Sequence, residues 1–258
     1  MSQCIKSLKI LNLSYSVELI KTPDFGGLRG LESLILKGCI SLTKVDESIA
    51  YLEGLVLLDL TDCISLRNVP CLPRSCVSLQ MSGCPNLHLL SCFYPEAVGH
   101  FECSGSTSLP SHLVKLNISN CNLFDASFPD DWRNLVSLKE LKIDKNNVTF
   151  LPKCVQSLPR LDILKARGCS HLKSILGPPK TLRVLNIECS KSLVKVQISR
   201  AGAVSVFSSG CQSLSCIDGP FKWQTIDKVE RKVIQNMGLG SSNAYGGIDI
   251  KQKVRSAF

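Results

Sequence analysis

The sequence predicts an α/β solenoid, in which a stack of similar repeats adds one short strand per repeat to a parallel sheet. Three observations lead to this prediction. An apolar pattern recurs at intervals of 21 to 25 residues along most of the chain. Each copy of the pattern ends on a small residue, most often cysteine. The composition is 44% hydrophobic but only 6% aromatic, which suits a core of many aliphatic layers better than one built around large rings.

The repeated pattern is L-x-x-L-x-L-x-x-C/N, and its spacing is typical of leucine-rich repeats. Successive copies start at Leu8, Leu31, Leu55, Cys76, Leu113, Leu138, Leu161 and Leu182, with a weaker copy at Ala203. The long interval between Cys76 and Leu113 predicts a degenerate copy around Val98, Phe101 and Cys103. We therefore expect a right-handed leucine-rich repeat horseshoe with the parallel sheet on its concave face. Irregular, 3-10 or short helical segments should form the convex face.

The apolar residues of L-x-L lie on one side of a strand because strand side chains alternate between the two faces. The ninth position lies where the chain leaves the strand and turns inward. Its side chain must therefore be small, and either apolar or able to bond neighbouring backbone groups. The cysteines at this position should be buried, unreactive thiols: Cys39, Cys63, Cys84, Cys121, Cys169 and Cys211.

The return segments and the tail give further expectations. Residues Val45–Leu52 and Cys154–Leu158 could form a helical turn or two, whereas the proline-bearing returns at 69–73 and 177–179 cannot be regular helix. We expect a repeat domain of about nine or ten repeats over residues 1–216, with the degenerate copy near 85–110. Residues 217–258 should hold a capping helix, read from helical spacing between Trp223 and Met237, and a flexible tail. The first template leucine follows Met1 closely, so we expect a piece of a longer protein or a truncated product.

Catalysis, metal binding and membrane insertion are not favoured. No Ser/His/Asp or Cys/His set forms a recognisable motif, and no C-x-x-C pair accompanies the four histidines. We therefore expect no enzyme activity and no cofactor. No apolar run approaches the length of a membrane span, and no secretory signal precedes the repeats. Free thiols and a cytoplasmic protein are the resulting expectation. The net charge of +9 permits nucleic-acid binding, but a solvated basic tail explains part of it, so no nucleic-acid partner is expected.

The functional surface should be the exposed face of the sheet, formed by the x positions around L-x-L. On neighbouring repeats these positions gather cations, with Asp144 and Glu140 interspersed. We expect this group to contact an acidic surface of a protein partner; a solvated mixed-charge face is the alternative. The candidate contact residues are Lys115, Lys142, Asp144, Lys165 and Arg167.

The wording of the repeats adds a resemblance. The phrases Leu8–Ser16, Leu19–Phe25, Leu31–Cys39 and Leu113–Leu123 resemble repeats of plant intracellular disease-resistance receptors of the TIR, nucleotide-binding and leucine-rich repeat type. The resemblance covers about residues 1–215. It implies the part of such a receptor that senses a pathogen effector, or a guarded host protein, and that restrains the other domains of the receptor. No G-x-x-x-x-G-K-S/T motif is present, so the resemblance carries over no catalytic residue, and the tail does not match the β-sandwich that often follows these repeats.

Two other functions fit the repeats. Substrate-recruiting subunits of ubiquitin ligases also carry cysteine at the ninth position, although an F-box and more uniform repeats normally accompany it. An extracellular receptor ectodomain is favoured by three glycosylation triplets, which begin at Asn12, Asn117 and Asn147, but such triplets are common by chance.

Overall fold

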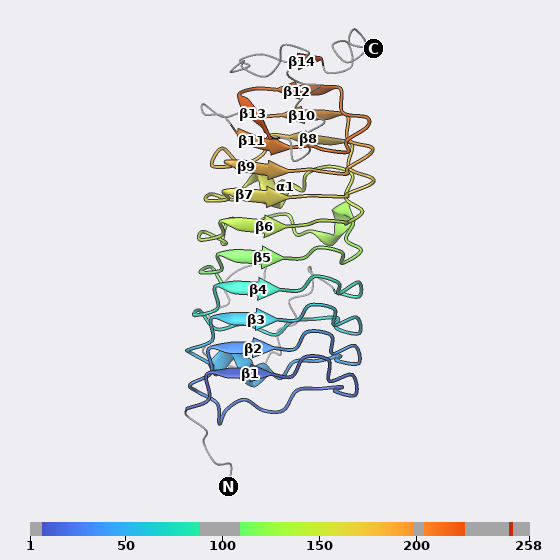
Figure 1. The fold of residues 1–258 in the computed structure, drawn as a ribbon. Helices are drawn as coiled ribbons and strands as arrows, with labels where there is room; N and C mark the ends of the chain where they lie inside the picture. The colour runs from blue at the N-terminus through green and yellow to red at the C-terminus, as the bar shows by residue number, and fades with distance from the viewer. Residues whose placement is uncertain (1–6, 88–108, 199–203, 225–247, 250–258) are drawn as a thin grey trace.

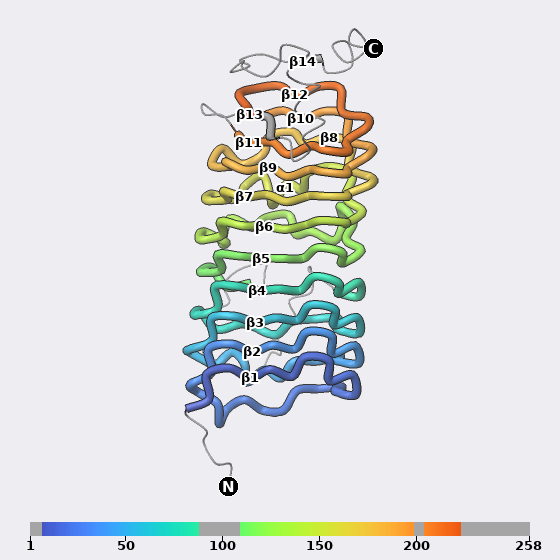
Figure 2. The backbone as a smooth tube through the Cα atoms, in the orientation of Figure 1, coloured from blue at the N-terminus to red at the C-terminus, as the bar shows by residue number. Residues whose placement is uncertain are grey.

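The computed structural model describes residues 7–87, 109–198, 204–224 and 248–249. These residues form an elongated stack of similar coils, most of which add one short strand to a common parallel sheet (Figure 1). The backbone follows nearly the same path from coil to coil along the stack (Figure 2). The predicted leucine-rich repeat solenoid is confirmed.

The main sheet contains ten parallel strands of three or four residues each. Such short strands are not stable alone, so each depends on the repeats on either side of it. The strands, in their order across the sheet, are β1 (Ile10–Asn12), β2 (Ser33–Ile35), β3 (Leu57–Asp59), β4 (Ser78–Gln80), β5 (Lys115–Asn117), β6 (Glu140–Lys142), β7 (Ile163–Lys165), β9 (Val184–Asn186), β11 (Val204–Phe207) and β13 (Phe221–Gln224).

The leucines at the middle of the three-residue strands lie in register across the sheet and form the core. Leu34 pairs with Leu58, and Leu79 pairs with Leu116. All four are buried, whereas the residues on either side of them are partly or fully exposed. Burying each leucine contributes about 1.5–3 kcal/mol relative to leaving it in water. The L-x-L pattern therefore gives both the strand and the face that it buries.

The segments on the far side of the core are irregular, with three short helical turns. These are the 3-10 helices η1 (Glu47–Tyr51) and η2 (Asp125–Ser127) and the α-helix α1 (Lys153–Gln156). The side chain of Asp46 caps η1 by accepting a hydrogen bond from the N–H of Ser48. The two helical turns predicted from the sequence, in 45–52 and 154–158, are confirmed. The proline-bearing returns at 69–73 and 177–179 contain no helix, as predicted.

In the last described repeats the far side is a second sheet instead. It consists of β8 (Ser174–Leu176), β10 (Lys195–Gln197) and β12 (Cys216–Asp218), all parallel, with β14 (Ile248–Asp249) antiparallel to β12. Strands on both sides of the core advance by about 4.8 Å per repeat, whereas a helix is about 10–12 Å wide. In these repeats the two sides of the core therefore advance by the same distance per repeat.

Side chains at the ninth position connect each repeat to the one before it. The Cys63 thiol donates to the carbonyl of Leu36 at 3.2 Å, and the Cys121 thiol donates to that of Met81 at 3.0 Å. The same contact recurs from Cys39 to Leu13, Cys84 to Leu60, Asn146 to Ile118, Cys169 to Ile143, Ser190 to Ala166 and Cys211 to Ile187. We call this series the turn ladder.

The thiols of the turn ladder are mostly buried, which lowers their reactivity. Five of the six cysteines are buried, as predicted, and Cys211 is half-buried. Burial raises the pKa of Cys63 to about 12 and that of Cys169 to about 11. Because the thiolate is the reactive form, these side chains serve as packed hydrogen-bond donors.

The residue just before the ninth position has a left-handed backbone. It is glycine in some repeats, such as Gly38 with φ of 71°, but Lys145 adopts φ of 54°. This conformation turns the N–H toward the next repeat, so that Gly38 donates to Thr61 and Lys145 donates to Arg167, both at 2.7 Å. A side chain at such a position costs about 1–2 kcal/mol.

The order of the strands bears on two expectations about the repeat boundaries. Strand β4 pairs directly with β5, through Leu79 and Leu116, so a repeat between them adds no strand to the main sheet. The degenerate copy expected around 98–103 itself lies outside the described residues. The main sheet also continues past the predicted boundary at 216, because β13 pairs with β11 and places Trp223 in a strand. The rest of the predicted capping helix and tail lies almost wholly outside the described residues.

Candidate protein-binding face

The exposed face of the main sheet carries the polar residues singled out from the sequence. Lys115 opens β5, Lys142 ends β6 and Lys165 ends β7. Asp144 and Arg167 lie two residues beyond the last two of these strands. Because β5, β6 and β7 are neighbours in register, the sheet brings all five residues onto adjacent repeats.

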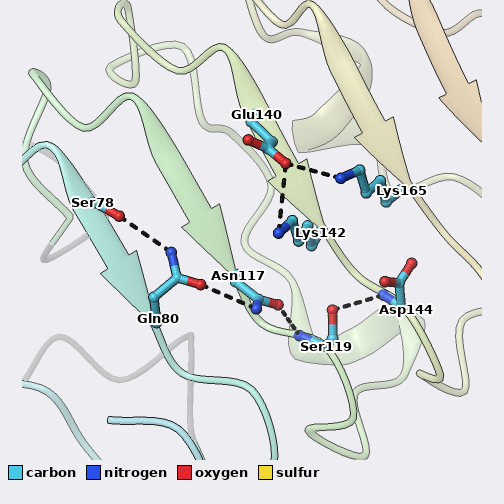
Figure 3. A network of polar contacts seen from close by, with 8 residues as sticks. All are labelled: Ser78, Gln80, Asn117, Ser119, Glu140, Lys142, Asp144 and Lys165. Carbon is cyan, nitrogen blue, oxygen red and sulfur yellow. Dashed lines mark hydrogen bonds and ion pairs between the residues drawn. The ribbon is translucent and has the colours of Figure 1, made fainter. Parts of the chain in front are cut away.

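Glu140, at the start of β6, lies between the lysines. Its carboxylate is 3.2 Å from the Lys165 ammonium and 3.6 Å from that of Lys142 (Figure 3). Burial raises the pKa of the Glu140 carboxyl, but the hydrogen bond from Lys165 and the surrounding lysine charges outweigh it. The pKa of Glu140 therefore lies below its ordinary value, and the carboxylate stays charged.

Arg167 is held in a similar way on the next repeats. Its guanidinium is 3.1 Å from the Glu188 carboxylate, which is nearly buried, with 7% of its side chain exposed. Asn186 donates a second hydrogen bond to that carboxylate, at 3.0 Å. The backbone N–H of Arg167 donates to Asp144 at 2.7 Å. Burial raises the pKa of Asp144 above its ordinary value, although that N–H and the nearby cations oppose the effect.

Uncharged side chains extend the polar surface toward the N-terminus. Gln80 donates to Ser78 at 3.2 Å and accepts from Asn117 at 3.1 Å. The side-chain oxygen of Asn117 accepts a hydrogen bond from the backbone N–H of Ser119. The hydroxyl of Ser119 in turn accepts one from the backbone N–H of Asp144 (Figure 3). These contacts continue across β4, β5 and β6. We call the residues from Ser78 to Glu188 that make these contacts, together with Lys115, the polar strip.

The polar strip combines ion pairs, formed by Glu140 with two lysines and by Arg167 with Glu188, with hydrogen bonds. It holds four cations (Lys115, Lys142, Lys165 and Arg167) and three carboxylates (Glu140, Asp144 and Glu188), a net charge of +1. The sequence placed the cations correctly in neighbouring rows, but it gave no sign that one glutamate engages two lysines. Ser78, at the first position of its strand, was also missed as a contributor. Its only signal in the sequence is its place beside the buried Leu79.

The described part of the chain was also compared with the requirements of a metal site and of a membrane span. There, no three His, Cys, Asp or Glu side chains are placed to hold a metal ion. Within the same residues, no helix combines the length and hydropathy needed to cross a membrane.

Comparison with known proteins shows which proteins have a similar sequence. No family model matches the chain. The TMV resistance protein N of Nicotiana glutinosa is 31% identical over 166 residues, which are 64% of this chain and 14% of that protein. The disease resistance protein RML1A of Arabidopsis thaliana is 30% identical over 206 residues, covering 76% of this chain and 20% of that protein. The chain thus spans about a fifth or less of the length of these relatives.

Solved structures of the same kind are more distant. A leucine-rich repeat protein from Bacteroides ovatus is 18% identical, with a TM-score of 0.33, over 86% of this chain and 70% of that one. The fold assignment rests instead on the repeated strands, their register and the turn ladder. The resemblance carried by the repeat phrases is confirmed by the sequence relatives. The chain is therefore a leucine-rich repeat solenoid with the repeat sequence of plant disease resistance proteins.

Proposed function

We propose that the chain is a non-catalytic protein-recognition module in a plant defence receptor and that the polar strip is its contact surface. The strip would read a pathogen effector or a guarded host protein, and other surfaces of the solenoid would contact the remaining domains of the same receptor. The relatives are disease resistance proteins, which supports the setting. The described cysteines are free thiols, which supports a cytoplasmic location.

The observation that carries the proposal is that side chains of the polar strip are held in place before any partner binds. Lys142 and Lys165 are each 33% exposed and are already held by Glu140. Binding therefore costs little side-chain entropy, because these groups are ordered before the partner arrives. A partner with carboxylates can compete for the same lysines while its donors satisfy Glu140. A complementary mixed-charge surface fits this strip better than a uniformly acidic one.

A charge-reversal experiment tests the proposal. The variant Lys142→Glu, Lys165→Glu and Arg167→Glu reverses the cations on the strip. The control, Lys153→Glu, Lys173→Glu and Lys180→Glu, makes the same net change at exposed positions away from the main sheet. Both variants should give the circular dichroism spectrum of the wild type.

Partners captured from plant extract by the three proteins are compared by quantitative mass spectrometry, and the purified candidates are then titrated. A partner that reads the strip should lose about tenfold or more in affinity, about 1.4 kcal/mol, for the strip variant alone. Equal affinity of both variants for every candidate partner would show that the polar strip is not the contact surface.

A further inference from the structure

A hollow of about 620 Å³ lies away from the polar strip, where the chain turns into β2, β3 and β4. Its volume lies within the range of about 300–1,000 Å³ that is usual for ligand sites. Three consecutive repeats contribute to it. The residues that carry the argument are Arg29, Ser48, Tyr51, Glu53, Arg74 and Ser75.

Three charges in this hollow occupy equivalent positions of their repeats. Arg29, Glu53 and Arg74 each stand two residues before the first apolar residue of the repeat pattern. All three are exposed, and none forms an ion pair with another described residue. Neighbouring strands are about 4.8 Å apart, so the row of positive, negative and positive charge spans about 10 Å at the backbone.

The serine hydroxyl groups of the hollow already form hydrogen bonds within its wall. Ser48 accepts a hydrogen bond from the N–H of Phe25 at 2.8 Å and donates to Asp46 at 2.6 Å. Ser75 donates to the carbonyl of Leu52 at 3.3 Å. Tyr51, at the end of η1, is 52% exposed. Arg29, Glu53 and Arg74 are therefore the groups with which a partner can form ion pairs, and about half of Tyr51 is exposed beside them.

We infer that this hollow receives a helical segment of a protein partner that carries an acid, a base and an acid along one face. Residues three, four and seven apart lie on one side of a helix. Seven residues rise about 10.5 Å, which matches the row from Arg29 to Arg74. The two acids pair with the arginines, the base pairs with Glu53, and a neighbouring apolar side chain packs on Tyr51. Arginine and carboxylate form the strongest of these contacts, because two parallel hydrogen bonds join them.

The alternating signs disfavour simpler occupants. A single anion held between the arginines would lie against Glu53, and Asp24 adds a second carboxylate to the lining. The same carboxylates repel the phosphates of a nucleic acid. This surface is separate from the polar strip, so the two proposals can fail independently.

The test uses two synthetic helical peptides of about 15 residues on the same alanine-rich background. One carries Glu, Lys and Glu at positions i, i+4 and i+7, and the other carries Lys, Glu and Lys. Fluorescence anisotropy measures their affinity for the full chain. We expect the wild type to bind the first peptide about tenfold more tightly than the second. The variant Arg29→Glu, Glu53→Lys and Arg74→Glu should show the opposite preference.

A control variant separates a local effect from one of overall charge. Arg67→Glu changes an exposed arginine that does not line the hollow, and it should keep the wild-type preference. Circular dichroism verifies that each variant is folded. The inference is overturned if neither peptide binds, if the wild type does not distinguish them, or if the triple variant keeps the wild-type preference.

Discussion

Replacing Asn146 by alanine should cost much more stability than its small size suggests. This side chain is 1% exposed and replaces cysteine in the turn ladder. Its oxygen accepts from the N–H groups of Cys121 at 3.0 Å and Leu123 at 3.1 Å. Its amide nitrogen donates to the carbonyls of Ile118 at 2.8 Å and Ile143 at 3.0 Å. Alanine leaves two buried N–H groups without this partner at about 1–3 kcal/mol each, a total of about 2–6 kcal/mol.

Chemical denaturation measures this loss, and hydrogen exchange locates it. Asn146→Cys should lose less than alanine, because a thiol restores the contact with Ile118 but not the two acceptor bonds. The control Asn147→Ala removes one side-chain contact, to Asn122 at 2.7 Å, and should change the free energy of unfolding by less than about 0.5 kcal/mol. Amides 121 and 123 should lose their protection in the alanine variant. A loss below about 1 kcal/mol, with protection retained there, would refute the assignment of these four bonds.

Three further predictions concern the core, the turns and the polar strip. Leu141→Ala removes a fully buried side chain and should cost about 2–5 kcal/mol in thermal or urea unfolding; an unchanged melting temperature would mean that the repeat register is wrong. Lys145→Gly relieves the left-handed backbone and should raise the free energy of unfolding by about 0.5–1 kcal/mol, whereas a loss would show that the lysine side chain stabilises the turn. Glu140→Gln should destabilise the fold at neutral pH. Because the pKa of Glu140 is lowered on folding, the difference from the wild type should shrink as pH falls below the ordinary value of 4.5, and a gap independent of pH would contradict the ion pairs.

The main sheet could be predicted because the apolar pattern that produces each strand lies within a single repeat. Leu34, Leu58 and Leu79 recur at nearly equal intervals, and a strand is the only element that buries one residue in two over so short a length. The turn cysteines were equally predictable, since a small side chain is required wherever the chain turns inward. Both features repeat, so each copy supports the assignment of the others.

The second sheet and the charge pairing could not be predicted in this way. Ser174–Leu176 is a strand because equivalent segments of the following repeats, such as Lys195–Gln197, are extended as well. The bridge between Phe150 and Ser174 shows that the helical turn at Lys153–Gln156 begins three residues beyond the position equivalent to the start of β8. The two contacts of Glu140 depend on lysine rotamers across neighbouring strands, which sequence spacing does not fix. The sequence therefore predicts which residues share a face, but not which of them are already paired.

The turn ladder has a consequence for how such a protein can change its length. Each contact joins a small side chain of one repeat to a backbone carbonyl of the repeat before it, and every repeat has that carbonyl. The donor therefore does not depend on the side chains of its neighbour. Deleting, duplicating or exchanging a whole repeat leaves a complete series of contacts behind, because the new neighbours meet through the same two groups. The outward positions of the sheet travel with the exchanged repeat, so the surface can be reshuffled in units while the interior stays the same.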